Sequence, residues 1–87
     1  MNNNISNLKK RLLYRSQYRG TKEMDKLIGS FVENHINTFN DIELKNLENF
    51  LNIDDDILYK FYNEQIIDDS LLKTKIGKLF KNFKYKK

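Results

Sequence analysis

The sequence predicts an all-α protein, a compact five-helix bundle formed by a single domain. Its 87 residues contain no proline and only three glycines, so the residues that usually interrupt helices are scarce. Apolar residues recur at steps of three and four along most of the chain, which is the spacing of one helix face. The apolar–polar alternation of a strand is not sustained in any segment. A chain of this length has room for one hydrophobic core.

The first two helices are predicted on either side of Gly20. The first runs from Ser6 to about Tyr18, and Gly20 supplies its C-terminal stop. Its apolar stripe consists of Leu8, Leu12 and Leu13. The second helix has the clearest periodicity in the chain, and we expect it to be the central element. Its apolar positions are Met24, Leu27, Ile28, Phe31, Val32, His35 and Ile36.

The third and fourth helices are predicted from their start signals. Asn40 and Glu43 have the spacing of a capping box, which places the start of the third helix at Asn40. Its inward residues are Leu44, Leu47, Phe50 and Leu51. The acidic run 54–56 offers an N-cap and favourable charges to the fourth helix. That helix is expected to turn inward Ile57, Leu58, Phe61 and Tyr62.

The fifth helix is predicted to begin at Asp69 or Ser70, either of which can cap it. Its apolar face is Leu71, Leu72, Ile76, Leu79, Phe80 and Phe83. A lysine-rich tail covers residues 78 to 87, where lysines and aromatic residues interleave. This pattern suits nucleic acid or an anionic membrane surface. The alternative, which we favour, is a helix with a buried Phe face and solvated lysines.

Charge is distributed unevenly along the chain, whose formal net charge is +4. Residues 1–32 carry seven Lys and Arg against two acids, for a net +5. Residues 33–69 carry ten acids against two lysines, for a net −8. Residues 70–87 carry seven lysines and no acid. Two basic ends around an acidic middle favour a partner surface of mixed charge over a uniform polyanion.

The composition argues against catalysis and against a metal site. The chain has no cysteine, one histidine and no glycine-rich phosphate loop, so we expect no enzymatic activity. His35 lies on the apolar stripe of the second helix, where a structural role is expected over that of a general base. No apolar run approaches the roughly 20 residues that span a bilayer, and the Asn-rich start lacks a signal-peptide pattern. We therefore expect a soluble protein without stable membrane insertion.

The most informative segment lies around Gly20. Five Lys and Arg residues fall between Lys9 and Arg19, and Glu23 follows in the first turn of the next helix. Gly20 lets the chain turn sharply and lets a partner's backbone approach. The alternative is a local Arg19–Glu23 ion pair, which is worth only about 0–1 kcal/mol when exposed and has the poorer residue order. We expect both side chains to project from the turn and to be free for a partner.

At these residues the sequence resembles the succinate dehydrogenase assembly factor family, bacterial SdhE and its mitochondrial counterpart, whose motif is Arg-Gly-x-x-Glu. The motif is present as Arg19, Gly20 and Glu23. The likeness extends from about residue 8 to residue 65, with the motif region at 8–25. Further matching residues upstream and downstream of the motif include Arg11, Leu12, Leu13, Tyr14, Ser16, Met24, Asp25, Leu27, Phe31 and His35.

The resemblance implies a five-helix chaperone that binds the flavoprotein subunit of succinate dehydrogenase, and in some bacteria fumarate reductase. It implies that the factor promotes covalent attachment of FAD to a histidine of this tricarboxylic acid cycle enzyme. FAD then belongs to the client, no cofactor is bound stably, and the factor acts by holding the client in a productive arrangement. The implied factor is a monomer when free, binds no nucleic acid, and works in the bacterial cytoplasm or the mitochondrial matrix.

The same resemblance implies a client-binding site around the motif. Arg19 and Glu23 would make charge-assisted hydrogen bonds to the client, whose backbone Gly20 would admit. Asp25 is the neighbouring acid, and the same face is widened by Tyr14, Arg15 and Tyr18. We expect Gly20→Ala or Glu23→Ala to leave the fold intact and abolish flavinylation support. Two other functions stay open, a small basic nucleic-acid-binding protein and a generic helical adaptor.

Overall fold

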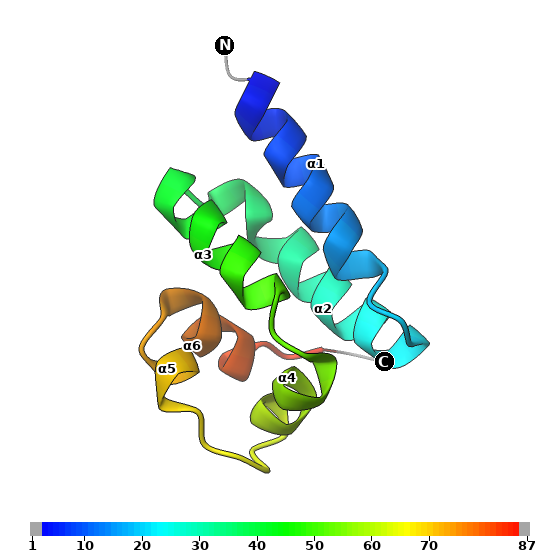
Figure 1. The fold of residues 1–87 in the computed structure, drawn as a ribbon, viewed down its shortest axis with the longest axis vertical. Coiled ribbons are helices and arrows are strands. Elements are labelled where there is room, and N and C mark those ends of the chain that lie inside the picture. Colours follow the sequence, from blue (N-terminus) through cyan, green and yellow to red (C-terminus); the bar gives the residue numbers. More distant parts are fainter. Residues whose placement is uncertain (1–2, 86–87) are drawn as a thin grey trace.

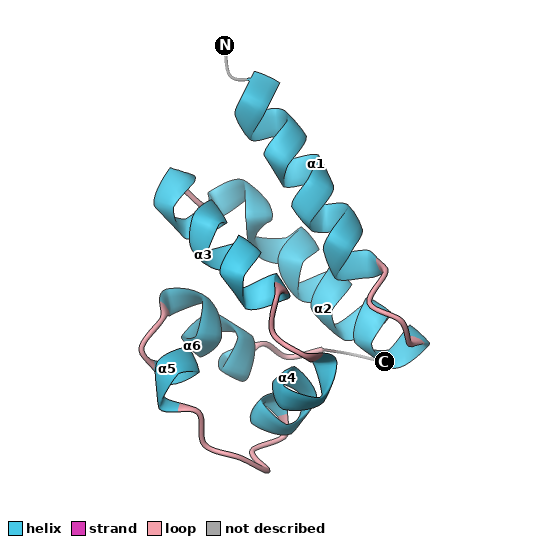
Figure 2. Ribbon diagram, viewed as in Figure 1, coloured by secondary structure: helices cyan, strands magenta, loops and turns pink. Residues whose placement is uncertain are grey.

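A computed structural model describes residues 3–85; the tail residues Lys86 and Lys87 lie outside this range. Within it the chain forms helices and connecting loops and no strand, as the sequence predicts (Figure 2). The prediction of five helices is wrong in number, because the described residues form six α-helices and one 3-10 turn. They are α1 (Asn3–Gln17), α2 (Lys22–His35), η1 (Ile36–Thr38), α3 (Asp41–Leu51), α4 (Asp55–Tyr62), α5 (Asp69–Leu72) and α6 (Lys75–Asn82).

The helices form two groups along the long axis of the molecule (Figure 1). The first group is an antiparallel pair, α1 and α2, with α3 packed against α1. The second group consists of the three short helices, in which α6 contacts α4 and α5 and also reaches α3. α1 begins at Asn3, before the predicted start at Ser6, and ends at Gln17. The loop from α3 to α4 passes close to the turn between α1 and α2 (Figure 1).

One aromatic core joins the two groups. Phe31 of α2 and Phe80 of α6 are fully buried, with ring centroids 5.2 Å apart. Phe50 of α3 packs edge-on against the same Phe80 ring at 5.2 Å. The predicted inward residues are mostly buried or packed against this core, with one correction. Ile57 is exposed, because the two-turn helix α4 turns only Leu58 and Phe61 fully inward.

The extra helix arises because the predicted fifth helix is interrupted at Thr74. The Thr74 N–H donates to the Leu71 carbonyl at 3.1 Å, which closes the end of α5. The Thr74 hydroxyl oxygen accepts from the Gly77 N–H at 2.9 Å and so acts as the N-cap of α6. The chain changes direction at this residue. Both Leu71 and Phe80 can therefore reach the core from two short helices.

Two of the predicted helix caps differ from the structure. Asp54 occupies the N-cap position of α4, but its side chain makes no capping hydrogen bond. The cap of α5 is Asp68, not Asp69 or Ser70, because Asp68 accepts from the Leu71 N–H at 3.1 Å. The hydroxyl of Ser70 donates to the same carboxylate at 2.6 Å, and together these bonds lower the pKa of Asp68. A single carboxylate thus organises the short connection into α5.

The capping box of α3 is confirmed and is tied to α6. Asn40 and Glu43 exchange hydrogen bonds of 2.8 and 2.9 Å between side chains and backbone N–H groups. Glu43 also accepts from Lys75, the first residue of α6, at 2.6 Å. The hydrogen bond from Lys75, followed by that from the Asn40 N–H, lowers the pKa of Glu43. The ionised form of Glu43 is therefore favoured by folding.

Glu43→Gln is expected to remove a pH-dependent part of the stability. A lowered pKa contributes stability above the unfolded-state value, near pH 4.3, and this contribution is lost as pH falls through the folded-state pKa. The difference in unfolding free energy between wild type and Glu43→Gln should therefore shrink between pH 6 and pH 3. Urea unfolding at several pH values measures it. A difference that stays constant with pH, or that also appears for exposed Glu33→Gln, would contradict this role.

Candidate functional site

The turn between α1 and α2 and the loop between α3 and α4 enclose two adjoining clefts. The first, here the tyrosine cleft, has a volume of about 420 Å³. Its lining residues are Tyr14, Arg15, Tyr18, Arg19, Leu51, Asn52, Ile53, Asp54 and Asp55. The second, here the acidic cleft, has a volume of about 310 Å³. Its lining residues are Thr21, Glu23, Met24, Asp55, Asp56 and Tyr59. Asp55 lines both clefts. Of the predicted site residues, all except Gly20 and Asp25 line one cleft or the other.

The tyrosine cleft carries two exposed aromatic rings. Tyr14 and Tyr18 lie one helical turn apart, with ring centroids 4.4 Å apart and 63% and 65% of their surface exposed. Neither ring packs into the core, so both are available at the surface. Large exposed aromatic side chains are typical of residues that anchor protein–protein interfaces. Both tyrosine rings are therefore exposed beside the cleft, and their role in partner binding stays a prediction.

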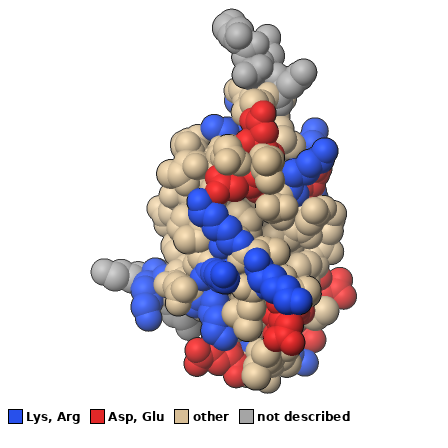
Figure 3. Space-filling model, turned by 90° about the vertical axis from the view of Figure 1, so that its left-hand side faces the viewer, with Lys and Arg blue, Asp and Glu red and all other residues tan. Residues whose placement is uncertain are grey.

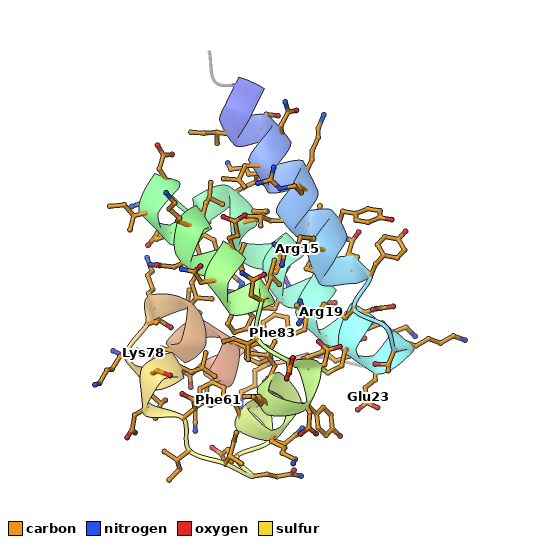
Figure 4. The ribbon with its side chains drawn as sticks, viewed as in Figure 1. Arg15, Arg19, Glu23, Phe61, Lys78 and Phe83 are labelled. Atoms are coloured by element: carbon orange, nitrogen blue, oxygen red, sulfur yellow. The ribbon has the colours of Figure 1, made fainter. Side chains whose placement is uncertain are left out.

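Arg19 points into the molecule, and this corrects the expectation that it projects freely from the turn. Its side chain is only 9% exposed and lies between α1 and the α3–α4 loop, beside Arg15 (Figure 4). Nε donates to Asp55 Oδ1 at 2.7 Å, and the two Nη atoms donate to the carbonyls of Leu51 at 2.6 Å and Ile53 at 2.9 Å. Its ion pair is therefore with Asp55, and the alternative of a pair with Glu23 is also wrong.

Gly20 and Asp25 together shape the turn itself. Gly20 has φ +126°, a conformation that residues with a side chain rarely adopt. Asp25 Oδ1 accepts from the backbone N–H groups of both Arg19 and Gly20, which holds the turn against the start of α2. The space above Gly20 is open, since an added Cβ would meet no atom within 4 Å. Gly20→Ala would thus strain the backbone of the turn as well as occupy this open space.

Glu23 is the charged side chain of the motif that faces outward. It lies exposed in the first turn of α2, on the side of α2 that faces α4 (Figure 4). Across the acidic cleft it forms a hydrogen bond with the Tyr59 hydroxyl, and this bond, followed by the negative charge of Glu23, raises the pKa of Tyr59. A carboxylate on the rim of a cleft can accept a hydrogen bond from a partner. The partner-binding role of Glu23 therefore stays a prediction, and its exposed position is compatible with it.

Asp55, Asn52 and Tyr59 are site residues that the sequence did not reveal. Asp55 was predicted only as part of an acidic helix start, yet it lies opposite Arg19, 36 positions away in the chain. Asn52 accepts a hydrogen bond from the Arg15 guanidinium. Tyr59 lies on α4 with 38% of its surface exposed. The acidic run 54–56 was the one sequence signal for Asp55. It indicated a helix cap and did not indicate that Asp55 pairs with Arg19.

His35 is used in packing. Its Nδ1 lies 2.8 Å from the Phe31 carbonyl, so this nitrogen carries the proton that it donates. Its ring packs against Phe31, Phe39 and Phe83 at centroid distances of 4.8, 6.2 and 6.0 Å. These contacts match the predicted structural role. Among residues 3–85, no group of three or more His, Cys, Asp or Glu side chains is arranged to hold a metal ion.

The C-terminal segment turns its aromatic residues inward. Phe80 is fully buried, and the Phe83 ring packs on Phe31 at 5.6 Å while Lys78 points outward (Figure 4). The Tyr62 hydroxyl donates to the Phe83 carbonyl at 2.7 Å and fixes the segment beyond α6. Lys and Arg side chains gather in a band on the face shown in Figure 3, with acids around it. The burial of Phe80 and the packing of Phe83 on Phe31, with Lys78 exposed, support the favoured interpretation of a buried Phe face with solvated lysines.

Both clefts carry charged side chains. Asp54 and Asp55 line the tyrosine cleft together with Arg15 and Arg19, whereas the lining of the acidic cleft has Glu23, Asp55 and Asp56 and no Lys or Arg. Negative charge in the acidic cleft disfavours a pyrophosphate group there. The chemistry that the site offers is recognition by hydrogen bonds, aromatic contacts and charge. In the part of the chain that the structure describes, no helix has both the length and the apolar character to cross a membrane.

Comparison with known proteins identifies the family. The family described as flavinator of succinate dehydrogenase matches residues 10–84. Succinate dehydrogenase assembly factor 2, mitochondrial, of Arabidopsis thaliana is 40% identical over 55 residues, which are 63% of this chain and 29% of that protein. FAD assembly factor SdhE of Acetobacter pasteurianus is 42% identical over 52 residues, which are 60% of this chain and 48% of that protein. No solved structure matches.

This chain spans less than half the length of these two curated relatives. The family match, in contrast, takes in almost the whole chain, from the middle of α1 to the segment after α6, and contains both clefts. The motif residues that suggested the resemblance lie within it. The chain therefore belongs to the flavinator of succinate dehydrogenase family.

Proposed function

We propose that this protein binds the flavoprotein subunit of succinate dehydrogenase, or that of fumarate reductase, and promotes covalent attachment of FAD to it. The family match over residues 10–84 carries the proposal. The names of both relatives support it, one an assembly factor of succinate dehydrogenase and the other an FAD assembly factor. The protein acts in the bacterial cytoplasm or, if eukaryotic, in the mitochondrial matrix, and it is a monomer until it binds its client.

The proposed mechanism is positioning. The exposed rings of Tyr14 and Tyr18 provide apolar contact area, and Glu23 provides a hydrogen-bond acceptor beside them on the same side of the molecule. FAD and the histidine that receives it belong to the client. Holding the reacting groups of the client in one arrangement is enough to lower a barrier substantially. The protein accordingly acts as a chaperone without enzymatic activity of its own.

Glu23→Ala is expected to weaken client binding about tenfold to a hundredfold, the range for losing one charge-assisted hydrogen bond. The test is co-expression with a flavoprotein subunit in cells lacking their own factor. Covalent flavin is measured by fluorescence of the denatured subunit in a gel. The matched control is Glu33→Ala, which removes an exposed glutamate from the far end of the same helix. We expect full flavin with wild type and Glu33→Ala and little with Glu23→Ala.

The opposite results are equally informative. No gain of covalent flavin with the wild-type chain, together with no complex, would overturn the proposed function. Full activity of Glu23→Ala would overturn the assignment of the site while leaving the function intact. Salt dependence separates this function from nucleic-acid binding, because phosphate-dominated binding falls steeply as salt rises, whereas client binding should survive moderate salt.

A further inference from the structure

Arg19 connects two loops that are far apart in the sequence. Its guanidinium contacts the carbonyl of Leu51 at the end of α3, the carbonyl of Ile53 in the α3–α4 loop and the side chain of Asp55 at the start of α4. A cation is favoured at the carbonyl end of a helix, and a carboxylate is favoured at the first turn of the next. The guanidinium thus satisfies a carbonyl at the end of α3 and pairs with the carboxylate at the start of α4. We call this arrangement the Arg19–Asp55 latch.

The residue that carries this guanidinium is also held at its backbone. Asp25 accepts hydrogen bonds from the N–H groups of Arg19 and Gly20, so the turn is fixed to α2 by one carboxylate. The side chain of Arg19 is fixed to α4 by another carboxylate, that of Asp55. The α1–α2 turn therefore cannot move relative to the α3–α4 loop without breaking the latch.

The latch forms the wall between the two clefts. Asp55 lines both of them, while Tyr18 lies in the tyrosine cleft and Glu23 in the acidic cleft. The Arg19 side chain is 9% exposed and that of Asp55 is 28% exposed, so the latch offers little surface to a partner. What it determines is the relative placement of the exposed groups on its two sides.

We propose that Asp55 is a positioning residue for client recognition and that Arg19 acts through Asp55, without touching the client itself. This inference rests on the proposed function. The latch holds the α1–α2 turn and the α3–α4 loop as one preformed surface, and a preformed surface avoids the ordering cost of assembling two mobile loops on binding. Asp55→Ala releases the loop from the turn, so client affinity falls by about tenfold, a size found for coupled neighbours.

The first measurement uses the free full-length chain. In ¹⁵N-labelled protein, the Arg19 Nε–H and the backbone amides of both loops are followed by NMR and hydrogen exchange. Asp55→Ala should speed exchange of the Arg19 Nε–H and shift amides on both sides of the latch. The matched control is Asp41→Ala, an exposed aspartate at the same first position of α3. An unchanged Arg19 signal in Asp55→Ala would overturn the latch.

The second measurement is client affinity, by calorimetry with a purified flavoprotein subunit at a temperature where circular dichroism shows every variant folded. Asp55→Ala should bind about tenfold more weakly, Asp55→Glu should recover part of the affinity, and Asp41→Ala should match wild type. The double variant Arg19→Ala/Asp55→Ala should bind no more weakly than Arg19→Ala alone. Additive losses would show that Arg19 touches the client and would overturn the proposal, as would unchanged affinity of Asp55→Ala.

Failure of the proposed function has a different signature. If the wild-type chain does not bind the flavoprotein subunit at all, the function falls, and a role of the latch in client recognition falls with it. The NMR measurement still decides whether Asp55 holds the two loops in the free chain. If wild type binds and Asp55→Ala binds equally well, the positioning role alone is overturned.

Discussion

Gly77→Ala is expected to lower the free energy of unfolding by about 2–4 kcal/mol, a large share of the stability of a chain this short. A Cβ at this position would lie 2.0 Å from the Leu71 carbonyl oxygen and 2.7 Å from its carbonyl carbon. Both are backbone atoms at the end of α5 and cannot rotate away. α6 would have to separate from α5, which would draw Ile76 and Phe80 out of the core. Thermal unfolding should show a decrease in Tm of more than about 10 °C.

Gly29→Ala is the matched control, because Gly29 is also buried within a helix. Its added Cβ would meet the flexible Gln17 side chain at 3.0 Å, and Gln17 can adjust. Alanine also has the better helix propensity, by up to about 1 kcal/mol. We therefore expect a change in stability of less than about 1 kcal/mol. Equal Tm values for the two variants would show that the α5–α6 junction is looser than the structure has it.

Arg19→Ala is expected to lower the free energy of unfolding by about 2–3 kcal/mol. Removing one partner of a buried ion pair typically costs about 3–5 kcal/mol, and the value is reduced for this pair because Asp55 is 28% exposed and regains water. The carbonyls of Leu51 and Ile53 also lose their donors. Arg19→Lys should recover only part of the loss, since an ammonium lacks the planar fork that reaches these acceptors. Urea unfolding measures both variants.

Arg11→Ala provides the comparison, because Arg11 forms an ion pair as well, in its case between α1 and α3. Its pair with Glu48 is 3.5 Å long, and the two side chains are 59% and 35% exposed. Exposed pairs of this kind contribute about 0–1 kcal/mol. If Arg11→Ala lowered the free energy of unfolding as much as Arg19→Ala, then the burial of Arg19 and its three hydrogen-bond acceptors would contribute no more stability than an exposed ion pair does.

Much of the fold was predictable because its signals are local. The apolar spacing of Leu27, Phe31 and their neighbours defines α2, and Asn40 with Glu43 marks the start of α3 through contacts within one helical turn. The break at Thr74 was not predictable in this way. The apolar pattern continues through it, and the break depends on Gly77 packing against the Leu71 carbonyl.

The sequence by itself determined that the chain is helical and where most helices begin, and it directed the site prediction to the residues around Gly20. These features depend on neighbours along the chain, whose distances are set by covalent geometry. Only the tertiary structure decided that Arg19 turns inward and that Glu23 remains outward. The choice depends on the Leu51 and Ile53 carbonyls and the Asp55 carboxylate, which the packing of α3 and α4 brings to one point beside the α1–α2 turn.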